Sequence, residues 1–224
     1  MDKISVITAD GSSTLFIPEW NESYHSRHGA IAESNHVFVE NGIASLTGQR
    51  RITILEVGFG TGLNALLTYI FACRQGIATE YHAIEPHPLN LEDCEKLNYT
   101  THLQDEQYED IFIKMHQTNQ GRIQLDANFV LIRHACTLKD FDNKEACNAD
   151  LVYYDAFGPR VQPEMWKEHN LVIVADALKP GGILVTYCAQ GAFRRSLRNL
   201  FFSVEKLEGP PGKREMTRAT KISH

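Results

Sequence analysis

A run of apolar and β-branched residues at positions 52–57 leads directly into three glycines at alternate positions, Gly58, Gly60 and Gly62. A short run that is apolar on both faces is typical of a strand covered by helices on each side of a parallel sheet. The glycines let the chain turn sharply and bring backbone N–H groups against a ligand at the start of the next helix. The sequence therefore predicts a nucleotide-type cofactor loop.

Two acidic residues narrow the choice of ligand. Glu56 stands before the first glycine, and this Glu-x-Gly-x-Gly-x-Gly spacing resembles the first motif of class I S-adenosylmethionine-dependent methyltransferases. Glu85 ends the next expected strand, where ligands bind in open α/β sheets and a carboxylate can accept hydrogen bonds from ribose hydroxyls. The alternatives are that Glu56 only hydrogen-bonds the turn and that Glu85 is an ordinary surface residue.

Strand-like and helix-like segments alternate along the rest of the chain, which favours an α/β fold. We expect a Rossmann-like class I methyltransferase with a mostly parallel seven-stranded sheet and helices on both faces. The expected strands lie at residues 52–57, 80–85, 128–133, 150–155, 183–187, 202–207 and 214–222. The first expected helix begins at Leu63 and ends before Gly76. The others cover residues 88–97, 106–115, 163–178 and 190–200.

The first 45 residues are expected to form a hairpin and a substrate-side extension, and residues 46–224 the methyltransferase domain. Residues 4–8 and 14–17 read as strands around an Asp-Gly turn. Residues 19–30 are rich in aromatic, His and Ser side chains, which fits a lid or substrate loop. A polar connector anchored by Trp20 and Tyr24 is the alternative.

The composition is that of one globular domain, with 43% hydrophobic and 22% charged residues in 224. No apolar run approaches the roughly 18 residues of a membrane span, and the first residues lack the layout of a signal peptide, so a cytoplasmic location without membrane contact is expected. Five cysteines without a Cys-x-x-Cys pair favour reduced thiols, mostly in the core, and no metal site.

The net charge of −6 does not by itself indicate a nucleic-acid partner. From Arg194 to the end, however, eight basic residues stand against three acidic ones. This distribution is compatible with a local phosphate-binding face, although solvated charges on a helix and two edge strands would produce the same count.

Asp155 ends the expected strand 150–155 and is followed by Ala156-Phe157-Gly158-Pro159. A carboxylate at this sheet edge can orient a nucleophilic amine and accept its proton, so we interpret Asp155 as the catalytic residue. The alternative is that it caps a turn. His134 and Ala135 follow the expected strand 128–133, where many methyltransferases carry an acid for the adenine; that acid is missing. We expect these two residues to contact the adenine, with a packing or surface role for His134 as the alternative.

Four ordered segments together resemble the methyltransferase domain of the bifunctional tRNA wobble-uridine modification enzyme, which completes 5-methylaminomethyl-2-thiouridine. They lie at residues 58–64, 155–166, 191–197 and 212–216, and the resemblance covers nearly the whole chain. Residues 10–15 and 24–33 look like the stand-alone version of this family, which lacks the flavin-dependent oxidoreductase domain.

The resemblance implies methylation of the primary amine of 5-aminomethyl-uridine in the tRNA anticodon, with S-adenosylmethionine as cofactor. The implied cofactor-binding residues are Glu56, Gly58, Phe59, Gly60, Gly62, Asn64, Glu85, His134, Ala135 and Asp155. Tyr24, Phe157 and Trp166 are expected to stack on the extruded uracil, and Arg194, Arg195, Lys213 and Arg214 to contact phosphates. A flavin- or GTP-dependent enzyme is the expected source of the aminomethyl group.

Three other functions stay open at this point. A methyl- or aminopropyl-transferase acting on a small free amine would share the fold and the acid at the same strand end. A non-catalytic RNA-binding relative would keep the fold without the reaction. A dinucleotide oxidoreductase is disfavoured, because its third glycine is missing at Leu63.

Overall fold

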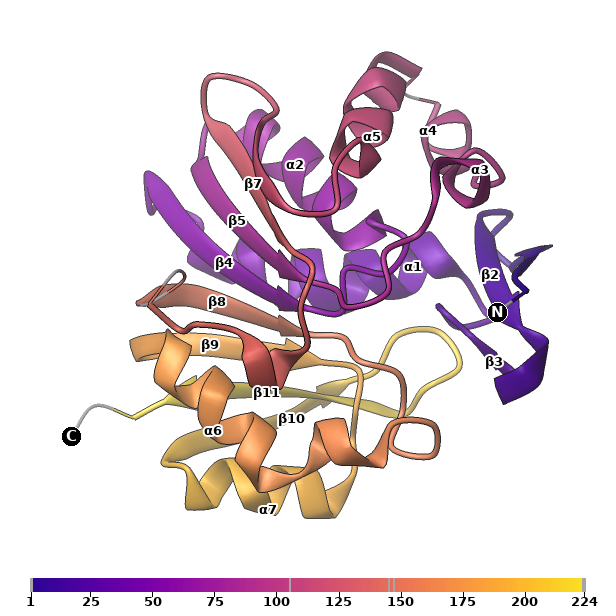
Figure 1. Ribbon diagram of the computed structural model, residues 1–224. Helices are drawn as coiled ribbons and strands as arrows, with labels where there is room; N and C mark the ends of the chain where they lie inside the picture. Colours follow the sequence, from indigo (N-terminus) through magenta and orange to yellow (C-terminus); the bar gives the residue numbers. More distant parts are fainter. Residues whose placement is uncertain (1, 105, 145, 147, 223–224) are drawn as a thin grey trace.

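The computed structural model describes residues 2–104, 106–144, 146 and 148–222. Within these residues, eight strands form the main sheet in the order β10-β11-β9-β8-β4-β5-β7-β6 (Figure 1). The five central strands are parallel, and the strands added at the two ends are antiparallel. Their bounds are β4 (Arg51–Val57), β5 (Ala78–Ile84), β6 (Gly121–Gln124), β7 (Phe129–His134), β8 (Ala149–Tyr154), β9 (Leu178–Thr186), β10 (Phe202–Glu208) and β11 (Glu215–Lys221).

The predicted α/β fold with a mostly parallel sheet is confirmed, with one strand more than the seven predicted. The additional strand is β6, which pairs with the edge of β7. Ile123 is its buried residue, and the neighbouring side chains are exposed. One buried side chain among polar ones leaves no periodic pattern, so the sequence does not indicate this strand.

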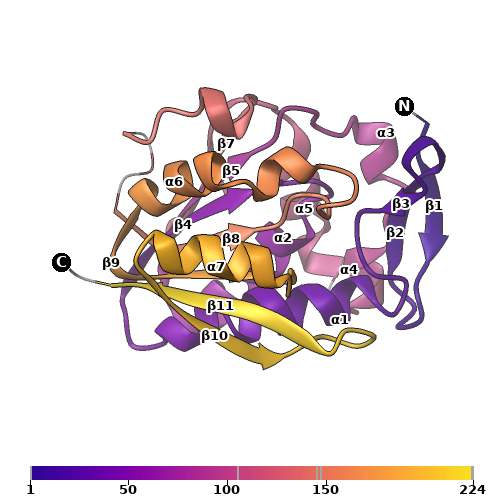
Figure 2. The same ribbon diagram turned by 90° about the horizontal axis from the view of Figure 1, so that it is seen from below.

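Helices cover both faces of the sheet. On one face, α2 (Leu63–Gln75), α5 (Glu109–His116) and the π-helical segment η2 (Asn35–Glu40) contribute to one hydrophobic cluster. On the other face, α6 (Glu168–Ala177) and α7 (Gly191–Asn199) lie side by side and contribute to a second cluster (Figures 1 and 2). The buried central strands therefore have apolar partners above and below, as their sequence predicts.

Two of the expected helices are shorter than predicted. The region 88–97 contains α3 (Leu91–Cys94), and the region 163–178 is divided into η6 (Pro163–Trp166) and α6 because Lys167 between them is extended, with ψ at 153°. The remaining short elements are α1 (Ala30–Ser34), α4 (Tyr99–His102), η1 (Pro18–Trp20), η3 (Ile43–Leu46), η4 (Glu106–Tyr108) and η5 (Leu138–Asp140).

The N-terminal residues form a separate antiparallel sheet in the order β1-β2-β3. It contains the predicted hairpin, β1 (Ile4–Ile7) and β2 (Ser13–Ile17), together with a short third strand, β3 (Glu22–Ser23). The Ser13 backbone N–H donates to Asn98 Oδ1 at 2.7 Å, which attaches this sheet to the α4 region. The domain boundary between residues 45 and 46 stays a prediction. Side chains from α1, η2 and η3, which precede this boundary, pack into the main core.

The helix α7 presents one basic side chain to the interior and not to solvent. Arg194 is only 3% exposed. Its guanidinium donates to Thr217 Oγ1 at 2.9 Å, to the Met216 carbonyl at 2.9 Å and to Glu215 Oε2 at 2.6 Å. The expectation that Arg194 is exposed and contacts phosphate is therefore wrong, whereas Arg195 is exposed. Only the packing of α7 on β11 distinguishes these two neighbours.

The lengths of the helices and the burial of the cysteines bear on two further expectations. Within the described part of the chain, none of the helices combines the length and the apolarity that a bilayer crossing requires. Cys94 and Cys188 are buried, Cys136 is half-buried, Cys73 is exposed, and Cys147 lies outside the described residues. The expectation of mostly buried thiols thus holds for two of these and not for Cys73.

Arg194→Ala should lower the free energy of unfolding by about 3 kcal/mol, because it leaves buried acceptors on β11 without their donor. Arg195→Ala, a matched change on the exposed side of α7, should change that free energy by less than about 0.5 kcal/mol. Urea unfolding followed by circular dichroism measures both. Equal effects of the two substitutions would contradict the structural role assigned to Arg194.

Candidate active site

A cavity of about 1050 Å³ lies over the carboxyl ends of β4, β5 and β8. Its walls come from the glycine loop after β4, from residues 84–88 and 137–139, and from residues 155–158 after β8. Residues 20 and 22–26 of the N-terminal segment and Lys213 also line it. This is the sheet edge where open α/β folds bind their ligands.

The glycine loop adopts a backbone that other residues rarely reach. Gly58, Gly60 and Gly62 have φ values of 92°, 51° and 76°. A Cβ atom on Gly58 would lie 2.6 Å from the Asp155 carbonyl oxygen, and one on Gly62 would lie 2.8 Å from His116 Nε2. The first and third glycines are therefore required by the close approach of β8 and α5 as well as by the turn.

Buried polar side chains support this loop from behind. His116 Nε2 lies 3.2 Å from the Thr61 carbonyl oxygen, and the Tyr99 hydroxyl donates to Thr61 Oγ1 at 3.0 Å. The guanidinium of Arg133 lies 3.7 Å from the centre of the Phe59 ring. Burial lowers the pKa of Arg133 to about 10, and Glu85 and Glu56 oppose this shift. The loop is thus held by the core on the side away from the cavity.

One amide connects the Asp155 carboxylate, which lines the cavity, with the Glu56 carboxylate buried behind it. Asn64 Nδ2 donates to Glu56 Oε1 at 2.9 Å and to Asp155 Oδ2 at 2.8 Å. Burial raises the pKa of Glu56 well above its ordinary value, and nearby Asp155 raises it further. Glu56 Oε2 and Asn64 Oδ1 are buried without a hydrogen-bond partner in the chain. Asn64 lines the cavity, so its Oδ1 fits a ligand that brings a hydrogen-bond donor. Glu56 does not line the cavity and has the buried Tyr81 hydroxyl beside it.

Glu85 is placed at the rim of the cavity by two backbone donors. Its Oε2 accepts from the Gly60 N–H at 3.0 Å, and its Oε1 accepts from the His87 N–H at 2.8 Å. Each carboxylate oxygen keeps a second lone pair for a further donor. The carboxylate is therefore oriented next to the glycine loop and can still accept hydrogen bonds from ligand hydroxyls.

Asp155 is half-buried at the end of β8 and lines the same cavity. Burial raises its pKa to about 7, and Glu33 contributes in the same direction, while the Asn64 hydrogen bond and Lys213 lower it. A carboxylate with a pKa near the working pH is suited to accept a proton and release it again. Among the described residues, no group of His, Cys, Asp and Glu side chains is arranged to hold a metal ion.

Comparison with known proteins decides between the ligands that this geometry permits. The family described as S-adenosyl-L-methionine-dependent methyltransferase matches residues 95–222, which is more than half of the chain. The chain belongs to this methyltransferase family. The match begins after the glycine loop, so the loop geometry supports the same conclusion independently. The cofactor of the enzyme is S-adenosylmethionine, and the glycine loop, Asn64 and Glu85, which line the cavity, are the residues that fit it. Glu56 is fully buried and does not line the cavity, so its predicted cofactor contact is corrected to a support of Asn64 from behind.

Relatives and solved structures agree with this assignment. The tRNA 5-methylaminomethyl-2-thiouridine biosynthesis bifunctional proteins of Cupriavidus metallidurans and Burkholderia multivorans are 31% and 32% identical over 95% and 91% of this chain. The chain spans about a third of the length of these relatives, 33% in each case. The crystal structure of MNMC2 from Aquifex aeolicus aligns with a TM-score of 0.75 and 25% identity, covering 99% of this chain and 70% of that one.

The adenine side of the methyltransferase site differs from the prediction. His134 is 8% exposed, and its ring stacks on that of His82 with His134 Nε2 and His82 Nδ1 3.1 Å apart. Neither His134 nor Ala135 lines the cavity; the next residues, Thr137, Leu138 and Lys139, do so instead. The predicted contact of His134 and Ala135 with adenine is corrected accordingly, because β7 ends with the His134 ring in the core.

Trp166 also lies behind the cavity wall and not in it. It is 7% exposed, and its indole N–H donates to the Phe157 carbonyl at 2.8 Å. Its ring packs among Tyr154, Tyr187 and Phe193. The prediction that Trp166 stacks on substrate is therefore wrong in this structure, and its hydrogen bond holds Phe157 at the cavity.

The predicted aromatic residues Tyr24 and Phe157 do line the cavity and contact each other, with ring centroids 5.0 Å apart. Trp20 joins them at 5.4 Å from Phe157. Trp20 is thus part of the cavity lining and not only an anchor of a connector; an aromatic residue in a polar segment is the sequence signal for it. Lys213 lines the cavity as well, whereas Arg195 and Arg214 are exposed outside it.

Gly58→Ala should weaken S-adenosylmethionine binding by roughly tenfold or more, because the added Cβ collides with backbone that cannot move away. Gly191→Ala is a matched control, since a Cβ there meets only the end of the Arg195 side chain at 3.4 Å. Isothermal titration calorimetry gives both dissociation constants, and thermal melting checks that each variant is folded. Unchanged affinity in folded Gly58→Ala would contradict the assigned loop.

Proposed function

We propose that this methyltransferase methylates the primary amine of 5-aminomethyl-(2-thio)uridine at the wobble position of tRNA. The observation that carries the proposal is the position of Asp155, which lies in one cavity between the cofactor loop and a group of aromatic side chains. The relatives named for 5-methylaminomethyl-2-thiouridine biosynthesis support the same substrate.

The cavity offers separate places for a cofactor and a base. Its volume of about 1050 Å³ is at the upper end of the roughly 300–1000 Å³ of ordinary small-molecule pockets. The glycine loop and Glu85 line it together with Trp20, Tyr24 and Phe157. Tyr24 lies where these two groups meet, because a Cβ atom on Gly60 would be 3.1 Å from its ring. Aromatic side chains stack on unpaired bases that leave the helix, so the aromatic group suits an extruded uracil.

Asp155 supplies the acid–base chemistry that methylation of an amine requires. S-adenosylmethionine provides an electrophilic methyl group when bound, so the acceptor nitrogen needs a free lone pair and correct placement. The Asp155 carboxylate is oriented by Asn64, whose Nδ2 donates to Asp155 Oδ2 at 2.8 Å. In its ionised form this carboxylate can orient the amine and accept the proton that the nitrogen loses.

Charged residues outside the cavity would contact the rest of the tRNA. Arg195 and Arg214 are exposed on the basic C-terminal part of the chain, so their guanidinium groups are accessible to tRNA phosphates. We also propose that the aminomethyl group comes from a separate flavin- or GTP-dependent enzyme, and that the protein acts in the cytoplasm where tRNA is modified.

The direct test is incubation of the protein and S-adenosylmethionine with tRNA that carries 5-aminomethyl-2-thiouridine. We expect the mass of that nucleoside to rise by one methylene unit, and Asp155→Ala to abolish the rise while leaving cofactor affinity largely intact. Free polyamines serve as competing substrates. Methylation of polyamines without any change in the tRNA would instead favour a transferase for small amines.

The rate constant kcat should rise with pH through about 7, because only ionised Asp155 can accept the proton of the amine. The kcat also depends on pH through deprotonation of the amine itself. Asp155 should therefore also be titrated directly by carbon-13 NMR. The Asp155→Asn variant identifies its resonance. A carboxyl group that titrates near the ordinary value of 3.8 would contradict the predicted shift.

A further inference from the structure

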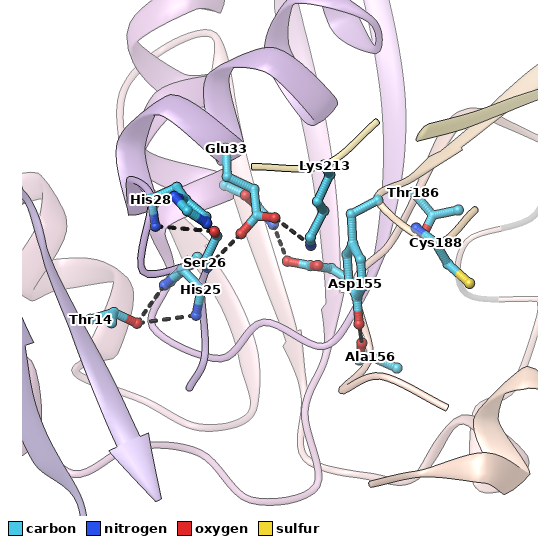
Figure 3. Close-up of polar contacts among 12 residues, drawn as sticks. Thr14, His25, Ser26, His28, Glu33, Asp155, Ala156, Thr186, Cys188 and Lys213 are labelled. Atoms are coloured by element: carbon cyan, nitrogen blue, oxygen red, sulfur yellow. Dashed lines mark hydrogen bonds and ion pairs between the residues drawn. The ribbon is translucent and has the colours of Figure 1, made fainter. Parts of the chain in front are cut away.

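We propose that Glu33 and Lys213 are positioning residues, whose ion pair holds residues 20–26 over the acceptor side of the cavity. The two residues belong to α1 and to the loop between β10 and β11, and they meet beside Asp155 (Figure 3). The inference rests on the proposed function, since it concerns how the acceptor base is held. It replaces the expected phosphate contact of Lys213.

The pair is one part of a continuous set of contacts. Lys213 Nζ lies 2.6 Å from Glu33 Oε1, and the backbone N–H of Ser26 donates to Glu33 Oε2 at 2.7 Å. The ammonium of Lys213 also lies 3.9 Å from the centre of the Tyr187 ring, and the Tyr187 hydroxyl donates to the Ala156 carbonyl at 2.7 Å. Figure 3 shows Glu33 between Ser26 and Lys213, with Asp155 next to Lys213.

Two further contacts join the same segments. His36 Nε2 lies 2.9 Å from the Glu208 carbonyl oxygen, at the start of the β10–β11 loop. A Cβ atom on Gly212 would lie only 2.0 Å from the ring of His28. The loop therefore fits closely against the N-terminal segment, and Lys213 enters the cavity from this contact.

Burial gives the ion pair its positioning role. Glu33 is 6% exposed, and the side chain of Lys213 is 33% exposed. Loss of the lysine would leave a buried carboxylate without its cation, an arrangement much less favourable than the intact pair. Because Ser26 is bonded to the same carboxylate and lies two residues after Tyr24, movement of Glu33 displaces the aromatic wall that faces Asp155.

The ammonium of Lys213 is therefore engaged in contacts within the protein. Glu33 and the Tyr187 ring already occupy it, so a phosphate contact would require the pair to break. The cofactor loop is also held from the core, where His116 and Tyr99 contact Thr61. Residues 20–26 reach the same region through Tyr24 beside Gly60 and His25 beside Tyr99, but these core supports do not depend on the ion pair. Loss of the pair should consequently affect the acceptor and spare the cofactor.

The test compares Lys213→Gln, Glu33→Gln and the conservative Lys213→Arg with wild type, and uses Lys206→Gln on exposed β10 as a charge-matched control. We expect Lys213→Gln to raise KM for tRNA by roughly tenfold while the Kd of S-adenosylmethionine changes by less than about twofold. Lys213→Arg should retain most of the wild-type KM, and Lys206→Gln should match wild type. Hydrogen exchange of residues 20–28 should accelerate in Lys213→Gln and in Glu33→Gln.

An unchanged KM and unchanged exchange in folded Lys213→Gln would overturn the inference. An equal loss of cofactor affinity would also overturn it, since it would mean general damage to the fold. If wild-type protein does not methylate tRNA, the proposed function fails, and hydrogen exchange still decides whether the pair holds the segment.

Discussion

The hydrogen bonds from the Asn64 amide to Glu56 and Asp155 are the interaction on which the rest of the site depends. They connect the ends of β4 and β8 through the first turn of α2, directly behind the glycine loop. Burial raises the pKa of both carboxyl groups, and the charge of Asp155 raises that of Glu56 further. The amide stabilises the ionised forms without adding a charge, so an acid–base group can operate at neutral pH in a largely dry site.

The two sides of the cavity are built differently. The cofactor side is part of the main core, where Arg133, Phe59 and His116 fix the loop from behind. The proposed acceptor side comes from residues 20–26 and the β10–β11 loop, and Glu33 of α1 contacts both through Ser26 and Lys213. A methyltransferase of this design can keep its cofactor site constant while peripheral segments select the acceptor.

Much of the fold was predictable because its signals are local. The apolar strands, the glycine turn and the helix that begins at Leu63 each depend on residues next to one another in the sequence. The errors have a common cause. Arg194, His134 and Trp166 carry the chemistry of a binding site, but each is placed in the interior by residues distant in the sequence. Strand β6 was missed because one buried residue makes no pattern.

The cofactor loop, the acid before it and the acids that end the neighbouring strands can be located from short stretches of sequence, because glycine conformation and strand periodicity act over a few residues. Which aromatic and basic side chains face the cavity depends on tertiary packing. Tyr24 and Lys213 lie far apart in the chain and become neighbours of Asp155 through the packing of the N-terminal segment on the β10–β11 loop. Such contacts depend on how whole elements pack, and composition does not record them.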